Sequence, residues 1–231
     1  MSSLLLLNGS PRGAGSNSMR ILSRVERGWR AHAGTGATVE TLHLAKRSQF
    51  DRAVEAYAEA DTVLIGMPLY ADAMPSLVKE YIEALAPRVG LPSNPRLAFL
   101  VQSGFSEALH SRGVERYFEK LAERLGSPYA GTIVHGGGEA LRSMPEQASK
   151  KLWARLDALG GSLARDGRFA EEPLAQVAGI ERFSAPVAAV LKAALVWPLP
   201  LVMWNGEMKK NGAYERRDAR PYVDGVHSSA G

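Results

Sequence analysis

A glycine-rich segment near the N-terminus, residues 9–18, carries polar side chains suited to holding an anion. Its polar members are Ser10, Arg12, Ser16, Asn17 and Ser18. An apolar run precedes this segment and a helix should follow it, so backbone N–H groups and the helix macrodipole would favour a phosphate there. The glycine spacing fits neither the nucleotide-triphosphate loop nor the dinucleotide-binding turn, which leaves a phosphate monoester as the expected ligand. The alternative is an ordinary Gly/Ser-rich turn in which Ser16 caps the helix.

A second segment, residues 67–75, places an aromatic ring between two prolines. Because proline fixes its own backbone and restricts the residue before it, this segment is expected to be stiff and extended. Such a stretch can border a flat heterocycle, with Tyr70 stacking or hydrogen bonding through its hydroxyl. The residues expected to do so are Pro68, Leu69, Tyr70 and Ala71. The alternative is a turn that only starts the following helix.

Two further loops follow later apolar runs. In residues 102–107, Ser103, Gly104 and Phe105 combine a hydroxyl, a glycine that permits close backbone approach, and a ring that suits ligand contact or core packing equally. Residues 135–139 hold three consecutive glycines before Glu139, and this loop either borders the same site or only turns the chain. His135 is expected to be structural, with no role in proton transfer.

Several kinds of chemistry are excluded by composition. The chain has no cysteine, so disulfides, thiol nucleophiles and Cys-ligated metals are ruled out, and a reducing cytoplasm is the expected location. The five histidines show no metal-ligand spacing, and no Gly-x-Ser-x-Gly elbow is present, so neither a metal site nor a hydrolase is expected. Redox chemistry would therefore come from a bound cofactor without a catalytic side chain.

The elements that must position these loops are five short strands alternating with helices. The expected strands are residues 4–7, 38–44, 62–66, 97–101 and 129–134. Apolar residues at helical spacing lie between them, which predicts an α/β fold with a doubly wound, five-stranded parallel sheet. In the flavodoxin-like order 2-1-3-4-5, the first three loops follow neighbouring strands around the point where ligands bind in such sheets.

Length and charge narrow the organisation and the partners. The chain has 231 residues and a net charge of +4 with the two signs interspersed, so no nucleic-acid partner is expected. The apolar stretch of residues 185–204 contains Lys192 and three prolines, which argues against a membrane-spanning segment. We expect one domain over residues 1–166 and a helical C-terminal extension, residues 167–231, that forms an interface or a lid rather than an independent domain.

These motifs together resemble the flavodoxin-like NAD(P)H-dependent FMN reductase family. The resemblance covers residues 1–165 and implies that FMN carries hydride from NAD(P)H to a quinone, a flavin or a similar small acceptor. It also implies a homodimer or homotetramer. The tail beyond Met144 departs from the compact family core.

The resemblance implies a role for each loop. Residues implied to hold the FMN phosphate are Ser10, Arg12, Ser16, Asn17 and Ser18. Residues implied to border the isoalloxazine are Pro68, Leu69, Tyr70 and Ala71 on one side and Ser103, Gly104 and Phe105 on the other. Backbone N–H groups of the second and third loops are expected to stabilise negative charge near the flavin N1 atom. The alternatives are a flavodoxin-like electron carrier that does not use NAD(P)H, and a regulatory protein that has lost the cofactor.

Overall fold

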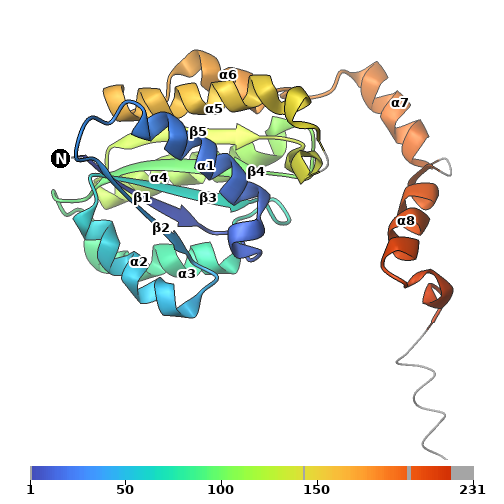
Figure 1. The fold of residues 1–231 in the computed structure, drawn as a ribbon, viewed down its shortest axis with the longest axis horizontal. Coiled ribbons are helices and arrows are strands. Elements are labelled where there is room, and N and C mark those ends of the chain that lie inside the picture. The colour runs from blue at the N-terminus through green and yellow to red at the C-terminus, as the bar shows by residue number, and fades with distance from the viewer. Residues whose placement is uncertain (1, 143, 197–198, 220–231) are drawn as a thin grey trace, which may run out of the picture. The chain divides into compact units, whose positions relative to one another are not determined.

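The computed structural model describes residues 2–142, 144–196 and 199–219 (Figure 1). Contacts along the chain divide it into two compact units, residues 1–182 and 183–231. The first unit contains the sheet and every loop singled out by the sequence.

The sheet of the first unit has five parallel strands in the order β2-β1-β3-β4-β5, as the sequence predicts. The strands are β1 (Ser3–Asn8), β2 (Thr38–His43), β3 (Thr62–Pro68), β4 (Arg96–Gln102) and β5 (Tyr129–His135). All residues of β3 and nearly all of β1 and β4 are buried, because helices cover both faces of the sheet. The loops after β1, β3 and β4 therefore leave the same edge from adjacent strands.

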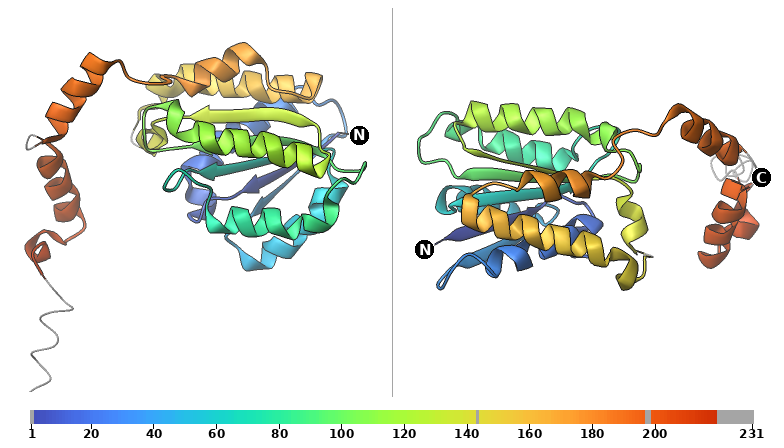
Figure 2. Two further views of the ribbon diagram at one scale, coloured as in Figure 1. Left: turned by 180° about the vertical axis from the view of Figure 1, so that it is seen from behind. Right: turned by 90° about the horizontal axis from the view of Figure 1, so that it is seen from above.

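Six helices form the two outer layers of this unit. They are α1 (Asn17–Arg30), α2 (Arg47–Glu59), α3 (Ser76–Ala84), α4 (Arg112–Leu125), α5 (Glu146–Asp166) and α6 (Glu171–Ala178). One core joins α2, α3 and α4 to one face of the sheet, and the other joins α1, α5 and α6 to the opposite face. Seen from behind, α4 lies in front of the strands (Figure 2, left). Alternate leucines of β1 enter the two cores, so neither face of this strand meets water.

Glycines let α1 and α5 pack closely. A side chain at Gly28 of α1 would overlap the backbone carbonyl of Asp157, and one at Gly160 of α5 would overlap that of Val25. Because backbone cannot move aside as a flexible side chain can, only glycine permits this separation. The close contact with α5 fixes the position of α1, whose N-terminus follows the predicted phosphate loop.

The first unit extends beyond the boundary expected from sequence. It runs to Arg182, whereas the sequence predicts a boundary after residue 166. Phe169 N donates to Ala130 O at 2.9 Å, and Phe169 and Val177 are buried in the core shared with α1 and α5. Helix α6 therefore covers the β5 edge as part of this unit.

Acidification should lower the free energy of unfolding because His135 is held neutral in this unit. Burial lowers the pKa of its imidazole, and the hydrogen bond from Nδ1 to Val177 O, 3.2 Å long, opposes that shift. The unfolded chain, with a pKa near 6.5, binds the proton more tightly. This contribution to stability is thus complete above that value and is lost as pH falls towards the lower folded pKa. Urea unfolding at about pH 7.5 and about pH 5.5 should show the loss, and His135→Gln should reduce it; an identical loss in the variant would contradict this assignment.

The second unit forms the helical C-terminal extension. Its helices are α7 (Ala185–Val196) and α8 (Leu199–Lys210), followed by a 3-10 turn, Tyr214–Arg216. Several apolar side chains of this unit are exposed, including Val190 and Trp204. Residues 197–198 of the apolar stretch lie outside the described residues. No helix in the described part of the chain combines the length and hydropathy needed to cross a membrane.

Candidate functional site

Asn8, the last residue of β1, shapes the first loop from beneath. Its side chain is fully buried; Oδ1 accepts a hydrogen bond from Ser10 N at 3.1 Å, and Nδ2 donates to Gly13 O at 2.7 Å. Nδ2 also lies 3.1 Å from Nδ1 of His43, which must be unprotonated to accept. Burial, with a smaller effect of Lys46, lowers the pKa of His43 and so favours that form. Asn8 was not among the predicted site residues, yet its hydrogen bonds to Ser10 and Gly13 hold the first half of the loop in place.

Helix α1 begins at the end of this loop. Ser16 is the N-cap, and its Oγ accepts from the backbone N–H of the third helical residue at 3.1 Å. The N–H groups of Asn17 and Ser18, in the first turn, have no carbonyl partner within the helix. Ser10 Oγ accepts from Arg12 N at 3.3 Å and keeps its own hydrogen to donate. Hydroxyl, amide and helix-end donors thus gather where the sequence predicts an anion.

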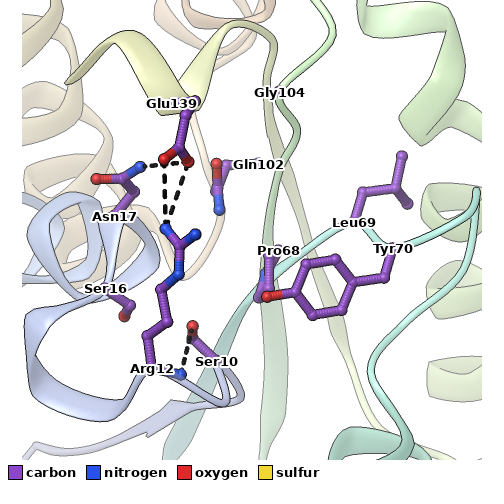
Figure 3. A pocket seen from close by; sticks show the side chains of 10 residues that line it. All are labelled: Ser10, Arg12, Ser16, Asn17, Pro68, Leu69, Tyr70, Gln102, Gly104 and Glu139. Carbon is purple, nitrogen blue, oxygen red and sulfur yellow. Dashed lines mark hydrogen bonds and ion pairs between the residues drawn. The ribbon is translucent and has the colours of Figure 1, made fainter. Parts of the chain in front are cut away.

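The first three loops, with one residue from the β5 loop, enclose a pocket at this edge of the sheet (Figure 3). Predicted residues that line it are Ser10, Arg12, Ser16, Asn17, Pro68, Leu69, Tyr70 and Gly104. The ring of Tyr70 lies beside Pro68, across the pocket from Arg12 (Figure 3). The structure therefore brings the predicted anion loop and the predicted ring-binding segment together.

The sequence matches a known protein family over most of its length. Residues 2–156 match a family described as having a flavodoxin-like fold. The chain belongs to this family. No curated protein is similar in sequence at a significant level.

Solved structures share the fold of this flavodoxin-like protein at low sequence identity. An FMN-dependent NADH-azoreductase from Bacillus anthracis is 17% identical with a TM-score of 0.56, covering 71% of this chain and 100% of its own. An NADH:FMN oxidoreductase is 14% identical with a TM-score of 0.56, covering 81% and 99%. An NAD(P)H:quinone oxidoreductase from Methanothermobacter marburgensis is 16% identical with a TM-score of 0.53, covering 70% and 96%. At these identities the likeness establishes the fold.

The segment after β3 is a tight turn rather than the stiff, extended stretch expected from its prolines. Tyr70 and Ala73 exchange two backbone hydrogen bonds of 2.9 Å, and Ala71 and Asp72 between them have φ angles of 47° and 60°. Two central residues with positive φ are the mark of a type I′ turn. Ala71 consequently sits exposed at the tip of the turn and does not line the pocket, while Tyr70 stays at its wall.

Three other predicted residues lie outside the pocket lining. Ser18 is fully buried, and its Oγ accepts from Gln102 Nε2 at 3.5 Å. Ser103 is buried and donates through Oγ to Phe105 O at 3.0 Å. Phe105 is 57% exposed and stacks on His110, with 4.4 Å between ring centroids. Their roles in ligand binding stay predictions, and any contact from Ser18 would come from its backbone N–H.

Two pocket residues were missing from the predicted set, Gln102 and Glu139. Glu139 reaches the pocket because the β5 loop passes very close to β4: Gly138 N donates to Ser103 O at 2.7 Å, and a side chain at Gly138 would overlap that of Gln102. The run of three glycines before Glu139 was the available signal, since glycine is typical where two backbones approach closely. That signal did not indicate which side chain the approach would bring in.

The donor set of the pocket fits a phosphate-bearing ligand. Asn17 also presents one unpaired acceptor: it is 3% exposed, and its Oδ1 has no hydrogen-bond partner in the described structure. This arrangement costs free energy, and a hydroxyl group of the ligand, rather than its phosphate, could relieve it. The enclosed volume is about 70 Å³, well below the roughly 300–1,000 Å³ of sites that surround a drug-sized molecule. The pocket can enclose a phosphate-sized group, and the rest of a larger ligand would lie along the open surface beside Tyr70 and Gly104.

Proposed function

We propose that this flavodoxin-like protein binds FMN and acts as an NAD(P)H-dependent oxidoreductase, with a quinone, a flavin or a similar small molecule as acceptor. The observation that carries this proposal is that the anion loop after β1 and the residues Pro68, Tyr70 and Gly104 line the same pocket. A phosphate donor set next to a wall suited to a flat ring matches the two ends of FMN. The activities for which the fold neighbours are named, including azoreductase and quinone oxidoreductase, support the same class of reaction. A cytoplasmic location is part of this proposal.

In this proposal the protein holds and orients the cofactor. The phosphate would accept hydrogen bonds from Ser10, Asn17 and the first N–H groups of α1, where the macrodipole favours negative charge. When bound, FMN supplies the hydride chemistry between nicotinamide and acceptor. The side chains lining the pocket bind and orient, and none is assigned a proton-transfer role.

The backbone limits which N–H groups can stabilise negative charge on a bound ring. Leu69 N donates to Gln102 O at 2.8 Å, and Ser103 N donates to His135 O at 3.0 Å. Tyr70 N is likewise used within its turn. These groups of the second and third loops are therefore already satisfied. We propose that the N–H of Gly104, which lines the pocket, takes this role.

The second and third loops each carry an exposed ring: Tyr70 lines the pocket, and Phe105 follows the lining residue Gly104 in sequence. Tyr70 is 47% exposed and Phe105 is 57% exposed, although aromatic rings of this size are usually well buried. Stacking of nicotinamide or acceptor, or contact with a second copy in a homodimer or homotetramer, would cover them. We propose that ligand stacking and contact with a second copy both occur in the active enzyme.

The purified protein should bind FMN with quenched flavin fluorescence and shifted visible bands. Anaerobic addition of NADH or NADPH should then bleach those bands. Bound flavin that neither nicotinamide reduces would contradict the reductase proposal and favour an electron carrier. Failure to bind FMN would overturn the site assignment itself. Riboflavin, which lacks the phosphate, is the matched control and should bind at least 10-fold more weakly if charged hydrogen bonds at the loop contribute as usual.

A further inference from the structure

The candidate phosphate site already contains a carboxylate of the protein itself. Glu139 belongs to the short 3-10 helix Gly138–Arg142 that follows β5. Both of its carboxylate oxygens lie 3.4 Å from Nη1 of Arg12, and Oε2 accepts from Nδ2 of Asn17 at 3.3 Å (Figure 3). Two of the side-chain donors expected to meet a phosphate are thus directed at an anion supplied by another loop.

The charges of the pocket cancel as a result. Among the residues that line it, Arg12 is the one cation and Glu139 the one anion in the described structure. An incoming phosphate would meet a neutral set of side chains, plus the partial positive charge at the N-terminus of α1. Removing the Glu139 charge would leave the Arg12 guanidinium available to the ligand.

Glu139 is held loosely by its side chain and firmly by its backbone. The contacts to Arg12 are 3.4 Å long and the two side chains are 51% and 60% exposed, whereas charge-assisted hydrogen bonds are usually 2.7–2.9 Å long. Such exposed pairs contribute little stability. By contrast, Leu141 is buried and its carbonyl accepts from Arg20 Nη1 at 2.7 Å, and Gly138 N donates to Ser103 O in the loop after β4. Rotation of the Glu139 side chain is therefore enough to release both donors.

We propose that Glu139 is a displaceable internal counter-ion of the phosphate site. Without a ligand it occupies the donors of Arg12 and Asn17, and a phosphate displaces it towards solvent. This competition lowers the affinity for phosphate-bearing ligands without affecting ligands that lack the phosphate. The inference rests on the proposed phosphate site and assigns Glu139 a role in setting its affinity and its charge selectivity.

The test uses Glu139→Gln in the full chain, because glutamine keeps the size and loses the charge. FMN binding, followed by quenching of flavin fluorescence, should be about 2- to 5-fold tighter than in the wild type, corresponding to one exposed charge pair released. The gain should shrink at high salt, since the unpaired Arg12 is screened. Riboflavin should bind both proteins equally. Glu119→Gln, an exposed substitution on α4 with the same change in net charge, should leave FMN affinity at the wild-type value.

The outcomes separate this inference from the proposed function. Wild type that binds FMN, with a Glu139→Gln variant that binds it equally or more weakly, overturns the counter-ion role and leaves the proposed function standing. Tighter binding of riboflavin by the variant also overturns it, because the effect would then not involve the phosphate. If neither protein binds FMN, the proposed function fails, and inorganic phosphate still tests the inference. Phosphate should raise the Tm of Glu139→Gln by more than that of the wild type, and an equal rise overturns the counter-ion role.

Discussion

The Ser16→Asp variant should fold and yet lose affinity for FMN by about 100-fold or more, the effect of a like charge in contact with a phosphate at low effective dielectric. Ser16 lines the pocket, is 1% exposed and caps α1 through its Oγ. Aspartate is as good an N-cap as serine, so the helix start is kept. The added carboxylate would lie where the loop otherwise offers donors, and it would repel the phosphate.

Ser16→Asn is the matched control, because asparagine also caps helices and has nearly the same size as aspartate. Its FMN affinity should stay within several-fold of the wild type. Titration of flavin fluorescence gives both affinities, and thermal unfolding shows whether the two variants are equally folded. Equal FMN affinity of the Asp and Asn variants would place the phosphate elsewhere. A similar loss in both would mean that packing at Ser16, rather than charge, controls binding.

Gly28→Ala should lower the free energy of unfolding by about 3 kcal/mol, at the upper end of the usual range for overpacking. The new methyl group would overlap the backbone carbonyl of Asp157, so α1 and α5 would have to separate along their whole contact. That movement would also displace the first turn of α1, which carries Asn17. FMN affinity is therefore expected to fall together with stability.

Gly113→Ala provides the control for this substitution. Gly113 lies in α4, and no atom outside its own turn of helix is within 4 Å of the position that its Cβ would take. Alanine there should raise stability by about 0.5–1 kcal/mol through helix propensity alone. Urea unfolding of the two variants compares a helical glycine needed for packing with one that is not. Equal effects of the two substitutions would show that close approach of α1 and α5 does not limit stability.

The sheet and the first loop could be predicted from sequence because their determinants are local. The Leu4–Leu7 run and residues 62–66 are continuously apolar, which suits strands covered on both faces, and each ends in residues that stop a strand. Alternation with helices then restricts the sheet to a few right-handed topologies. Ser16 could be assigned to the start of α1 because N-capping depends on a few neighbouring residues.

Some features of the site depend on which side chains meet across the fold. Ser18 shares the Ser/Asn sequence of the loop, but its side chain is buried against Gln102 and does not itself line the pocket. The two prolines around Tyr70 suggested an extended segment, whereas the hydrogen bonds between Tyr70 and Ala73 close a tight turn.

The sequence by itself thus determined the five strands and their alternation with helices, the edge of the sheet where the site lies, and the loop that provides the anion donors. Tertiary structure decided that Glu139 faces Arg12 and that α6 belongs to the first unit, because both result from contacts between segments far apart in the chain. Periodicity reports which face of an element is buried, and it carries no information about the distance between two loops. The position of the β5 loop is set here by the close packing of Gly138 against the Gln102 side chain and by the hydrogen bond from Gly138 N to Ser103 O.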